Sequence, residues 1–126
     1  MQQTGAELLL TLESDDELTL SLYWQAQTPT DRPYTVFTHL VAADGFNRTG
    51  RDNQPVWGSY PTTAWQPGDK VTDKYTLSLP LGTPPGDHRL QIGWYQSDSQ
   101  VLVPVLDAAG QPVADHVVLT VIIRVE

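Results

Sequence analysis

A two-residue alternation of large apolar side chains runs along much of this sequence and restricts its fold more than any other feature. Leucine or tryptophan occupies every second position in the segments 8–12 and 18–24. Successive side chains of a β-strand point to opposite faces of a sheet, whereas a helix repeats every 3.6 residues. The spacing therefore predicts two strands, joined by a turn at residues 14–16.

The same reasoning predicts strands along most of the remaining chain. Residues 34–41 are rich in β-branched and aromatic side chains, and Asp44-Gly45 follows them, a pair that favours a tight turn. Residues 71–79 carry mainly apolar side chains at odd positions, whereas Lys, Thr and Ser occupy the even ones. Further strands are expected at 90–94, 101–106 and 116–125.

About seven or eight short strands, with no convincing helix, predict an all-β fold. Short strands with one apolar face are best satisfied by two antiparallel sheets packed face to face, a β-sandwich. The chain has 126 residues, which corresponds to a single domain over 1–126. It contains no cysteine, so the disulfide typical of antibody domains is missing. Both an immunoglobulin-like and a jelly-roll strand order therefore stay open.

The charge balance excludes some partners. Fifteen Asp and Glu residues outnumber seven Lys and Arg, which gives a formal net charge of −8. Binding to a phosphate backbone depends on Lys and Arg, so we expect no nucleic-acid partner, and anionic membrane surfaces are poor candidates. No apolar run approaches the roughly 20 residues that a membrane-spanning helix requires.

The segment 46–66 resists assignment to a strand. It combines aromatic side chains with Asn, Gln, Asp and Arg, and loops of this length in a compact domain are often functional. Aromatic rings stack on the apolar faces of sugars, while carboxylates and amides bond to the hydroxyl groups. The candidate ligand-binding residues are therefore Trp57, Tyr60, Trp65, Asp52 and Gln54.

These aromatic residues also have a purely structural interpretation. Trp and Tyr are often half-buried for packing, so they could close one end of the sandwich. The two interpretations differ in one observable. An exposed, co-facial arrangement of Trp57, Tyr60 and Trp65 favours a sugar ligand, whereas burial of all three favours a scaffold.

Asp73 is the most informative carboxylate, because it falls in phase with the apolar positions of its strand and so points toward the core. A buried charge is costly unless it is hydrogen-bonded or paired. We expect Asp73 to lie at the sandwich edge, or to be satisfied by backbone amides, Arg51 or a histidine. Its role is expected to be structural.

Catalytic and metal-binding signals are weak. A glycosidase needs two carboxyl groups across a cleft, and fifteen acidic residues make any pair chosen from sequence arbitrary. The histidines His39, His88 and His116 are too far apart for a zinc motif. The stretches 44–47 and 107–110 are explained by turns rather than calcium loops. We therefore expect no enzyme activity, no metal and no cofactor, with a small hydrolase as the least favoured reading.

Several strings along the chain together resemble one protein family. They include Leu22-Tyr23-Trp24, Arg51-Asp52-Asn53-Gln54-Pro55, Trp65-Gln66-Pro67-Gly68 and Gln91-Ile92-Gly93-Trp94-Tyr95. Over residues 8–125 the chain resembles the β-sandwich domain at the C-terminal end of large bacterial membrane proteins. Many of these proteins are polytopic glycosyltransferases similar to protein mannosyltransferases. The resemblance implies an extracytoplasmic domain of a longer membrane protein, whose membrane portion is the expected partner and carries the catalytic residues.

Two functions follow from these observations. The first is a non-catalytic extracytoplasmic accessory domain of a glycosyltransferase-like membrane protein, which binds or orients a saccharide. The alternative is a purely structural or protein-interaction β-sandwich without a small-molecule ligand. An unpaired edge strand, for example the terminal 117–125 strand, would favour partner docking by strand addition.

Overall fold

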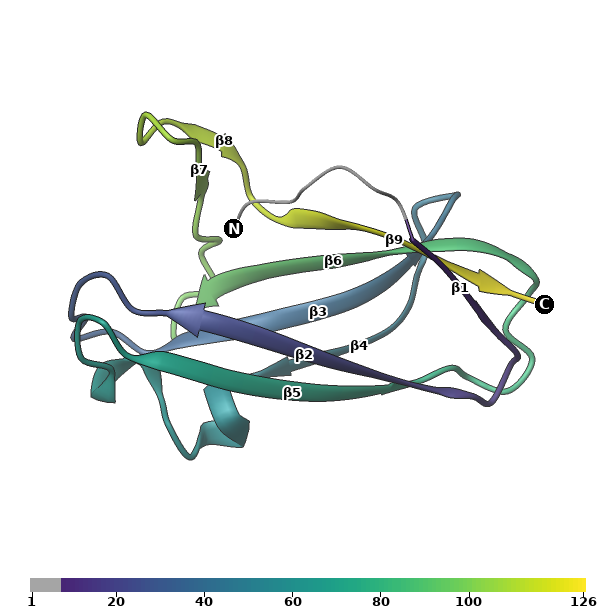
Figure 1. Cartoon of the computed structure of the whole chain (residues 1–126), viewed down its shortest axis with the longest axis horizontal. Helices are drawn as coiled ribbons and strands as arrows, with labels where there is room; N and C mark the ends of the chain where they lie inside the picture. Colours follow the sequence, from purple (N-terminus) through teal and green to yellow (C-terminus); the bar gives the residue numbers. More distant parts are fainter. Residues whose placement is uncertain (1–7) are drawn as a thin grey trace.

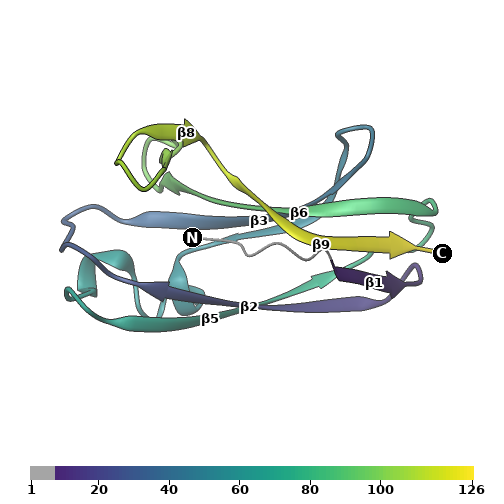
Figure 2. The ribbon, with the colours of Figure 1, turned by 45° about the horizontal axis from the view of Figure 1, so that its top comes forward.

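The computed structural model describes residues 8–126, whose strands form two layers packed face to face (Figures 1 and 2). The large sheet has five strands in the order β1-β9-β6-β3-β4, the small sheet pairs β2 with β5, and β7 pairs with β8 in a short hairpin. The strands are β1 (Leu8–Leu12), β2 (Glu17–Gln25), β3 (Tyr34–Ala42), β4 (Asn47–Asn53), β5 (Lys70–Ser78), β6 (Gly86–Gln96), β7 (Val105–Leu106), β8 (Pro112–Ala114) and β9 (Val117–Val125). The predicted all-β sandwich is confirmed, with nine strands in residues 8–126 instead of seven or eight.

The small sheet follows the predicted alternation closely. Strands β2 and β5 pair antiparallel without interruption, from Glu17 opposite Ser78 to Gln25 opposite Lys70. Even positions of β2 and odd positions of β5 are the more buried ones. This sheet therefore has one apolar face, which it buries against the large sheet.

Strand order selects between the two sandwich types that the sequence left open. In the immunoglobulin fold, strands B and E share one sheet, while C′, C, F and G are neighbours in the other. Here β2 and β5 take the places of B and E, and β4, β3, β6 and β9 take those of C′, C, F and G. The order is thus immunoglobulin-like. Strand β1 is an exception to the antiparallel pattern, because it runs parallel to β9.

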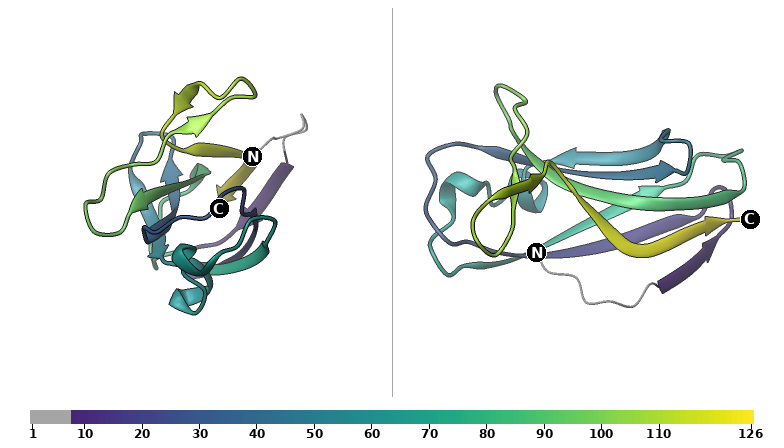
Figure 3. Two further views of the ribbon diagram at one scale, coloured as in Figure 1. Left: turned by 90° about the vertical axis from the view of Figure 1, so that its left-hand side faces the viewer. Right: turned by 90° about the horizontal axis from the view of Figure 1, so that it is seen from above.

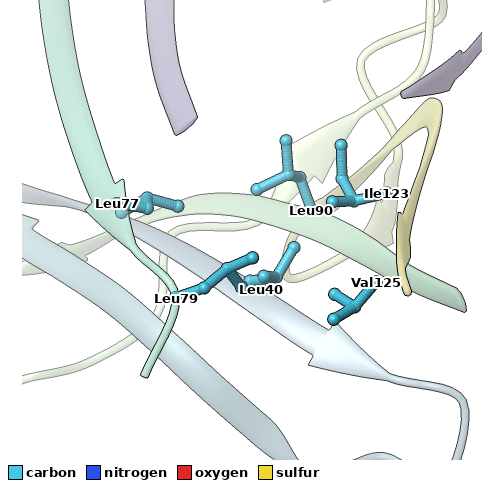
Figure 4. Close-up of a cluster of buried hydrophobic side chains, with 6 residues drawn as sticks. All are labelled: Leu40, Leu77, Leu79, Leu90, Ile123 and Val125. Atoms are coloured by element: carbon cyan, nitrogen blue, oxygen red, sulfur yellow. The ribbon is translucent and has the colours of Figure 1, made fainter. Parts of the chain in front are cut away.

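An aliphatic cluster lies between the two layers (Figure 4). Its fully buried members come from β3, β6 and β9 of the large sheet, and from β5 and the residue that follows it: Leu40, Leu90, Ile123, Val125, Leu77 and Leu79. Burying one such side chain contributes roughly 1.5–3 kcal/mol. This cluster therefore contributes to holding the layers together.

Strand β4 corrects the expectation that 46–66 contains no strand. Its sequence, Asn-Arg-Thr-Gly-Arg-Asp-Asn, carries no large apolar side chain, yet it pairs antiparallel with β3. An edge strand needs only backbone pairing on one side, so the apolar alternation is missing. Gly50 lies opposite His39, and a Cβ there would be 2.6 Å from the Thr38 carbonyl oxygen, so the close approach of the two strands requires glycine.

The rest of this segment forms two short 3-10 helices, η1 (Pro55–Gly58) and η2 (Thr62–Ala64). Val56 and Trp57 in η1 adopt positive φ angles of 54° and 56°. This left-handed region costs roughly 1–2 kcal/mol for a residue with a Cβ. A compensating tertiary contact is therefore needed, and it comes from Asp73 of β5, as described below.

The region after β6 departs from the predicted strand at 101–106. Only Val105–Leu106 forms a strand, β7, and Leu102 makes an isolated bridge with Tyr95. Pro104 lies between them and cannot donate a backbone hydrogen bond. Strand β8 was not predicted, and the hairpin of β7 and β8 projects from the sandwich (Figure 3).

The terminal strand, which served as the example of an edge that could be unpaired, has partners on both sides. Strand β9 pairs with β6 on one side and with β1 on the other, over Val121–Val125. Within residues 8–126, the strands that pair on one side only are β1 and β4 in the large sheet, both strands of the small sheet and both strands of the β7–β8 hairpin.

Candidate functional site

Three tryptophans meet at one end of the sandwich, where β2 and β6 finish and β3 begins. The rings of Trp24 and Trp94 pack edge to face, with centroids 4.7 Å apart and planes at 60°. Trp65, which follows η2, packs edge to face on Trp94 at 6.0 Å and 86°. Edge-to-face contacts are a favoured geometry for aromatic pairs. The three rings therefore form a rigid aromatic cluster.

A cleft of about 430 Å³ lies beside this cluster, within the size range of small-molecule sites. It is lined by Trp24, Trp65, Trp94, Tyr34, Gln25, Gln27, Thr28, Thr30, Thr62, Ala26, Pro29 and Val103. Most of the polar lining residues come from the end of β2 and the connection to β3, and none of the lining residues in the described chain is charged. We call this site the tryptophan cleft.

The position of Trp65 is set by its neighbours in the same loop. Its indole Nε1 donates a hydrogen bond of 2.9 Å to the carbonyl oxygen of Tyr60, and the two rings stack at 6.3 Å. The Tyr60 hydroxyl donates to the carboxylate of Asp69. This hydrogen bond lowers the pKa of Asp69 and raises the pKa of Tyr60. These hydrogen bonds fix the conformation of the loop around Trp65.

Asp73 of β5 points into the interior of the sandwich, where its carboxylate lies next to Trp24. The indole Nε1 of Trp24 lies 3.4 Å from the Asp73 carboxylate. The Tyr75 hydroxyl donates to the same carboxylate at 2.5 Å, and the backbone N–H of Val56 donates at 2.9 Å. Burial, and then the bond to Asp73, raise the pKa of Tyr75 far above its ordinary value.

These contacts confirm the prediction that hydrogen bonds satisfy the carboxylate of Asp73. Its exposed fraction is 0%, and a backbone amide satisfies it, as expected. The two side-chain donors were not predicted, since Arg51 and a histidine were the expected partners. Arg51 instead donates to the carbonyl oxygen of Thr76 at 3.3 Å and lies over the ring of Trp57.

The structure separates the aromatic residues that were predicted to form one platform. Trp57 is 56% exposed and contacts the Tyr75 ring and the Arg51 guanidinium. Tyr60 is half-buried, and Trp65 is only 8% exposed. Within the described residues no ring contact joins Trp57 to the other two. Neither pattern named in advance, full exposure or full burial, is found.

The two predicted polar residues also lie apart from the tryptophan cleft. Asp52 is on β4, where its carboxylate accepts a hydrogen bond of 3.1 Å from the Tyr95 hydroxyl and lies 3.1 Å from Nε2 of His39. Gln54 precedes η1, and its carbonyl oxygen accepts a bond from Gly58. Of the five candidates, only Trp65 lines the tryptophan cleft.

The acidic turns use their carboxylates locally. Asp44 accepts a hydrogen bond from the backbone of Phe46, and Asp107 accepts from Ala109 and Gln111. This agrees with the reading of both stretches as turns. Across residues 8–126, no three His, Asp or Glu side chains gather closely enough to hold a metal ion.

Sequence reasoning missed Trp24 and Trp94, the two other tryptophans of the cleft. Each was assigned to a strand by its spacing, and nothing local distinguishes them from core residues. A second cavity of about 290 Å³ is lined by the same pair of tryptophans. Its lining is largely aliphatic: Trp24, Ile92, Gly93, Trp94, Val103, Pro104, Val105, Leu106 and Val117.

Comparison with known proteins adds no identification. No protein-family model matches the chain, and no curated protein matches it. Within residues 8–126, no helix has the length and apolar character needed to cross a membrane.

Proposed function

We propose that this chain is a non-catalytic domain that holds a saccharide in the tryptophan cleft. The observation that carries the proposal is the cleft itself, where three tryptophans adjoin threonine and glutamine side chains. Indole faces pack on the CH faces of a sugar ring, and the hydroxyl and amide groups can bond to its hydroxyls. The uncharged lining suits a neutral sugar.

The proposed site shares only Trp65 with the site predicted from the sequence. In this site Trp24 and Trp94 replace Trp57 and Tyr60 as the aromatic rings on which the sugar packs. Gln25 and Gln27 replace Asp52 and Gln54 as polar partners.

The cellular setting is proposed from the sequence resemblance alone. In this view, the chain is an accessory domain on the extracytoplasmic side of a bacterial membrane, joined to a glycosyltransferase-like membrane portion. That portion would be its partner and would carry out the chemistry. The accessory domain would bind or orient the sugar.

A glycan array probed with the chain tests this proposal. Gln27→Ala removes an exposed amide of the cleft without touching the core, and Trp94→Ala removes a ring face. Both variants are expected to weaken the binding of a sugar that the wild type retains, and thermal unfolding of each shows whether the fold is intact. Trp57→Ala is the matched control, because its ring is exposed but outside the cleft.

A structural role is the second candidate, and one observation favours it. Trp65 is 8% exposed and belongs with Ala26 and Val71 to a buried cluster, so the tryptophans also close the end of the sandwich. A blank array would leave this scaffold function as the better account. Sugar binding that survives Gln27→Ala and Trp94→Ala unchanged would place the sugar elsewhere.

A further inference from the structure

The outer edge of β2 carries backbone groups that no strand in residues 8–126 pairs with. The N–H of Leu79 donates to the carbonyl of Asp16, and the N–H of Ala26 donates to that of Asp69. Asp16 and Ala26 are the even-numbered residues that directly precede and follow β2. Because the N–H and C=O of a strand residue point to one side and alternate along the strand, the even positions bond β5. The odd positions, Thr19, Ser21 and Tyr23 among them, direct theirs away from β5.

This edge lacks the features that usually protect an edge strand. Natural sheets block such edges with lysine, proline, bulges or short strands. Strand β2 is nine residues long, contains no Lys, Arg or Pro, and keeps an unbroken register with β5. The edge therefore has the properties of a strand that can still accept a neighbour.

Apolar surface lies beside the same edge. Leu20 and Leu119 are only partly buried, although each packs against the core of the sandwich. Trp24 at the end of β2 opens onto the aliphatic cavity of about 290 Å³. A strand added to β2 would place alternate side chains on the inner face, opposite Leu20, Leu22 and Trp24. Those side chains would need to be apolar.

Charge specifies the occupant further. The net charge is −8, and Asp15, Asp16 and Glu17 stand together at the start of β2. Asp107 directly follows residues 103–106, and Asp115 lies two residues before Val117, all of which line the cavity. No Lys or Arg occurs between Arg89 and Arg124. Lys74 and Lys70 of β5 pair with Ser21 and Gln25, so the acidic surface is confined to the start of β2 and to the rim of the cavity. A basic segment is attracted to these parts, whereas a second copy of this chain is repelled by its net negative charge.

We propose that the outer edge of β2 binds an extended segment of a partner protein that is apolar at alternate positions and basic in net charge. The segment adds to the small sheet as a third strand, so that main-chain hydrogen bonds supply affinity and the apolar side chains supply specificity. This interaction is independent of the saccharide proposal, because it depends on the edge of β2 and not on the polar lining of the tryptophan cleft.

A nine-residue peptide that alternates lysine and valine, matched to the length of β2, is the probe. Hydrogen exchange of the backbone amides of Thr19, Ser21 and Tyr23 is the measurement. In the chain alone these amides are expected to exchange rapidly. Saturating peptide should slow them by about tenfold or more, because exchange then requires the added strand to open. A peptide alternating glutamate and valine, and a scrambled lysine–valine peptide, should have much less effect.

Proline at an outward position separates edge binding from folding. Ser21→Pro removes an N–H that points away from β5, so the β2–β5 ladder is kept while the added strand loses a donor. Peptide affinity is expected to fall about tenfold or more in Ser21→Pro and to be unchanged in Ser21→Ala, which retains the N–H. Thr19→Pro is a second variant with the same expected loss, should Ser21→Pro fail to fold.

Several outcomes would overturn the proposal. Equal binding of the basic, acidic and scrambled peptides would show nonspecific association. If the three amides are protected in the absence of peptide, and the protection increases with protein concentration, the edge binds a second copy of the chain. Protection that is independent of concentration would assign it to a segment of the chain itself. A blank glycan array together with the expected peptide binding would contradict only the saccharide proposal.

Discussion

The carboxylate of Asp73 and the backbone N–H of Val56 form a hydrogen bond of 2.9 Å that ties the small sheet to the loop after β4. Val56 has a left-handed backbone conformation, so the bond holds a residue that is strained by itself. The same carboxylate accepts from the Tyr75 hydroxyl and lies within reach of the Trp24 indole. One buried acid thus connects a loop, a sheet and the wall of the tryptophan cleft.

Asp73→Ala is expected to lower the free energy of unfolding by about 3 kcal/mol, since it leaves buried donors without an acceptor. Asp73→Asn keeps the volume and one carbonyl oxygen, so a smaller loss of about 1–2 kcal/mol is expected. Urea denaturation measures both, with the exposed Asp31→Ala as the control. Equal stability of all three variants and the wild type would contradict the structural role of Asp73.

Gly93→Ala is expected to cost about 1–3 kcal/mol, because a Cβ there would overlap a neighbouring ring. The added atom would lie 2.3 Å from Cζ of Phe37, on the strand opposite. A double-mutant cycle with Phe37→Leu tests the cause, since the shorter side chain leaves room. The cost of Gly93→Ala should fall by about 1 kcal/mol in the Phe37→Leu background. An unchanged cost would place the strain elsewhere.

Trp65 and Trp57 should differ strongly when each is truncated. Trp65→Ala removes a buried ring and its hydrogen bond to Tyr60, with an expected loss of about 3–5 kcal/mol. Trp57→Ala removes an exposed ring that contacts the Arg51 guanidinium and the Tyr75 ring, so a loss of about 1 kcal/mol or less is expected. Thermal and chemical unfolding of the two variants give the comparison. Similar losses would contradict the burial difference between them.

The pair formed by Tyr60 and Asp69 predicts sensitivity to acid. The hydrogen bond from Tyr60, followed by that from the Gln66 backbone, holds the pKa of Asp69 below its ordinary value of about 3.9. A carboxylate with a lowered folded-state pKa contributes stability above its unfolded pKa, and this contribution is lost as the pH falls through the folded value. The difference in unfolding free energy between the wild type and Asp69→Asn should therefore be constant near neutral pH and shrink in acid.

Tyr60→Phe removes the same hydrogen bond from the other side and should show the same convergence with the wild type in acid. Unfolding followed by urea at a series of pH values checks both variants. A difference that stays constant down to the lowest pH would show that Asp69 contributes through packing and not through its charge.

The alternation of side chains predicted the strands that face the core, and it did so because those strands bury one face. Residues 71–79 show this best, since even the exception, Asp73, was read correctly as an inward-facing group. The same pattern could not find β4, whose polar side chains carry no alternation and whose pairing is made by the backbone. Nor could it find the short hairpin strand β8.

The candidate site was only partly predictable for a related reason. Trp57, Tyr60 and Trp65 are close in sequence, and the prediction grouped them on that ground. The left-handed turn at Val56 and Trp57 directs Trp57 toward Arg51 and Tyr75, whereas Trp65 turns toward Trp94. Trp24 and Trp94 join the cleft from strands that are distant in sequence, so no local signal indicated them.

The sequence by itself determined that this chain forms a β-sandwich with an aliphatic interior and a buried acid, because side-chain periodicity and the cost of burying charge act on each strand separately. Only the tertiary structure decided the strand order, the meeting of three tryptophans and the edge of β2 that no strand in residues 8–126 pairs with. These features depend on which strands become neighbours, and strand pairing is a relation between distant segments that is set by how the two sheets pack together.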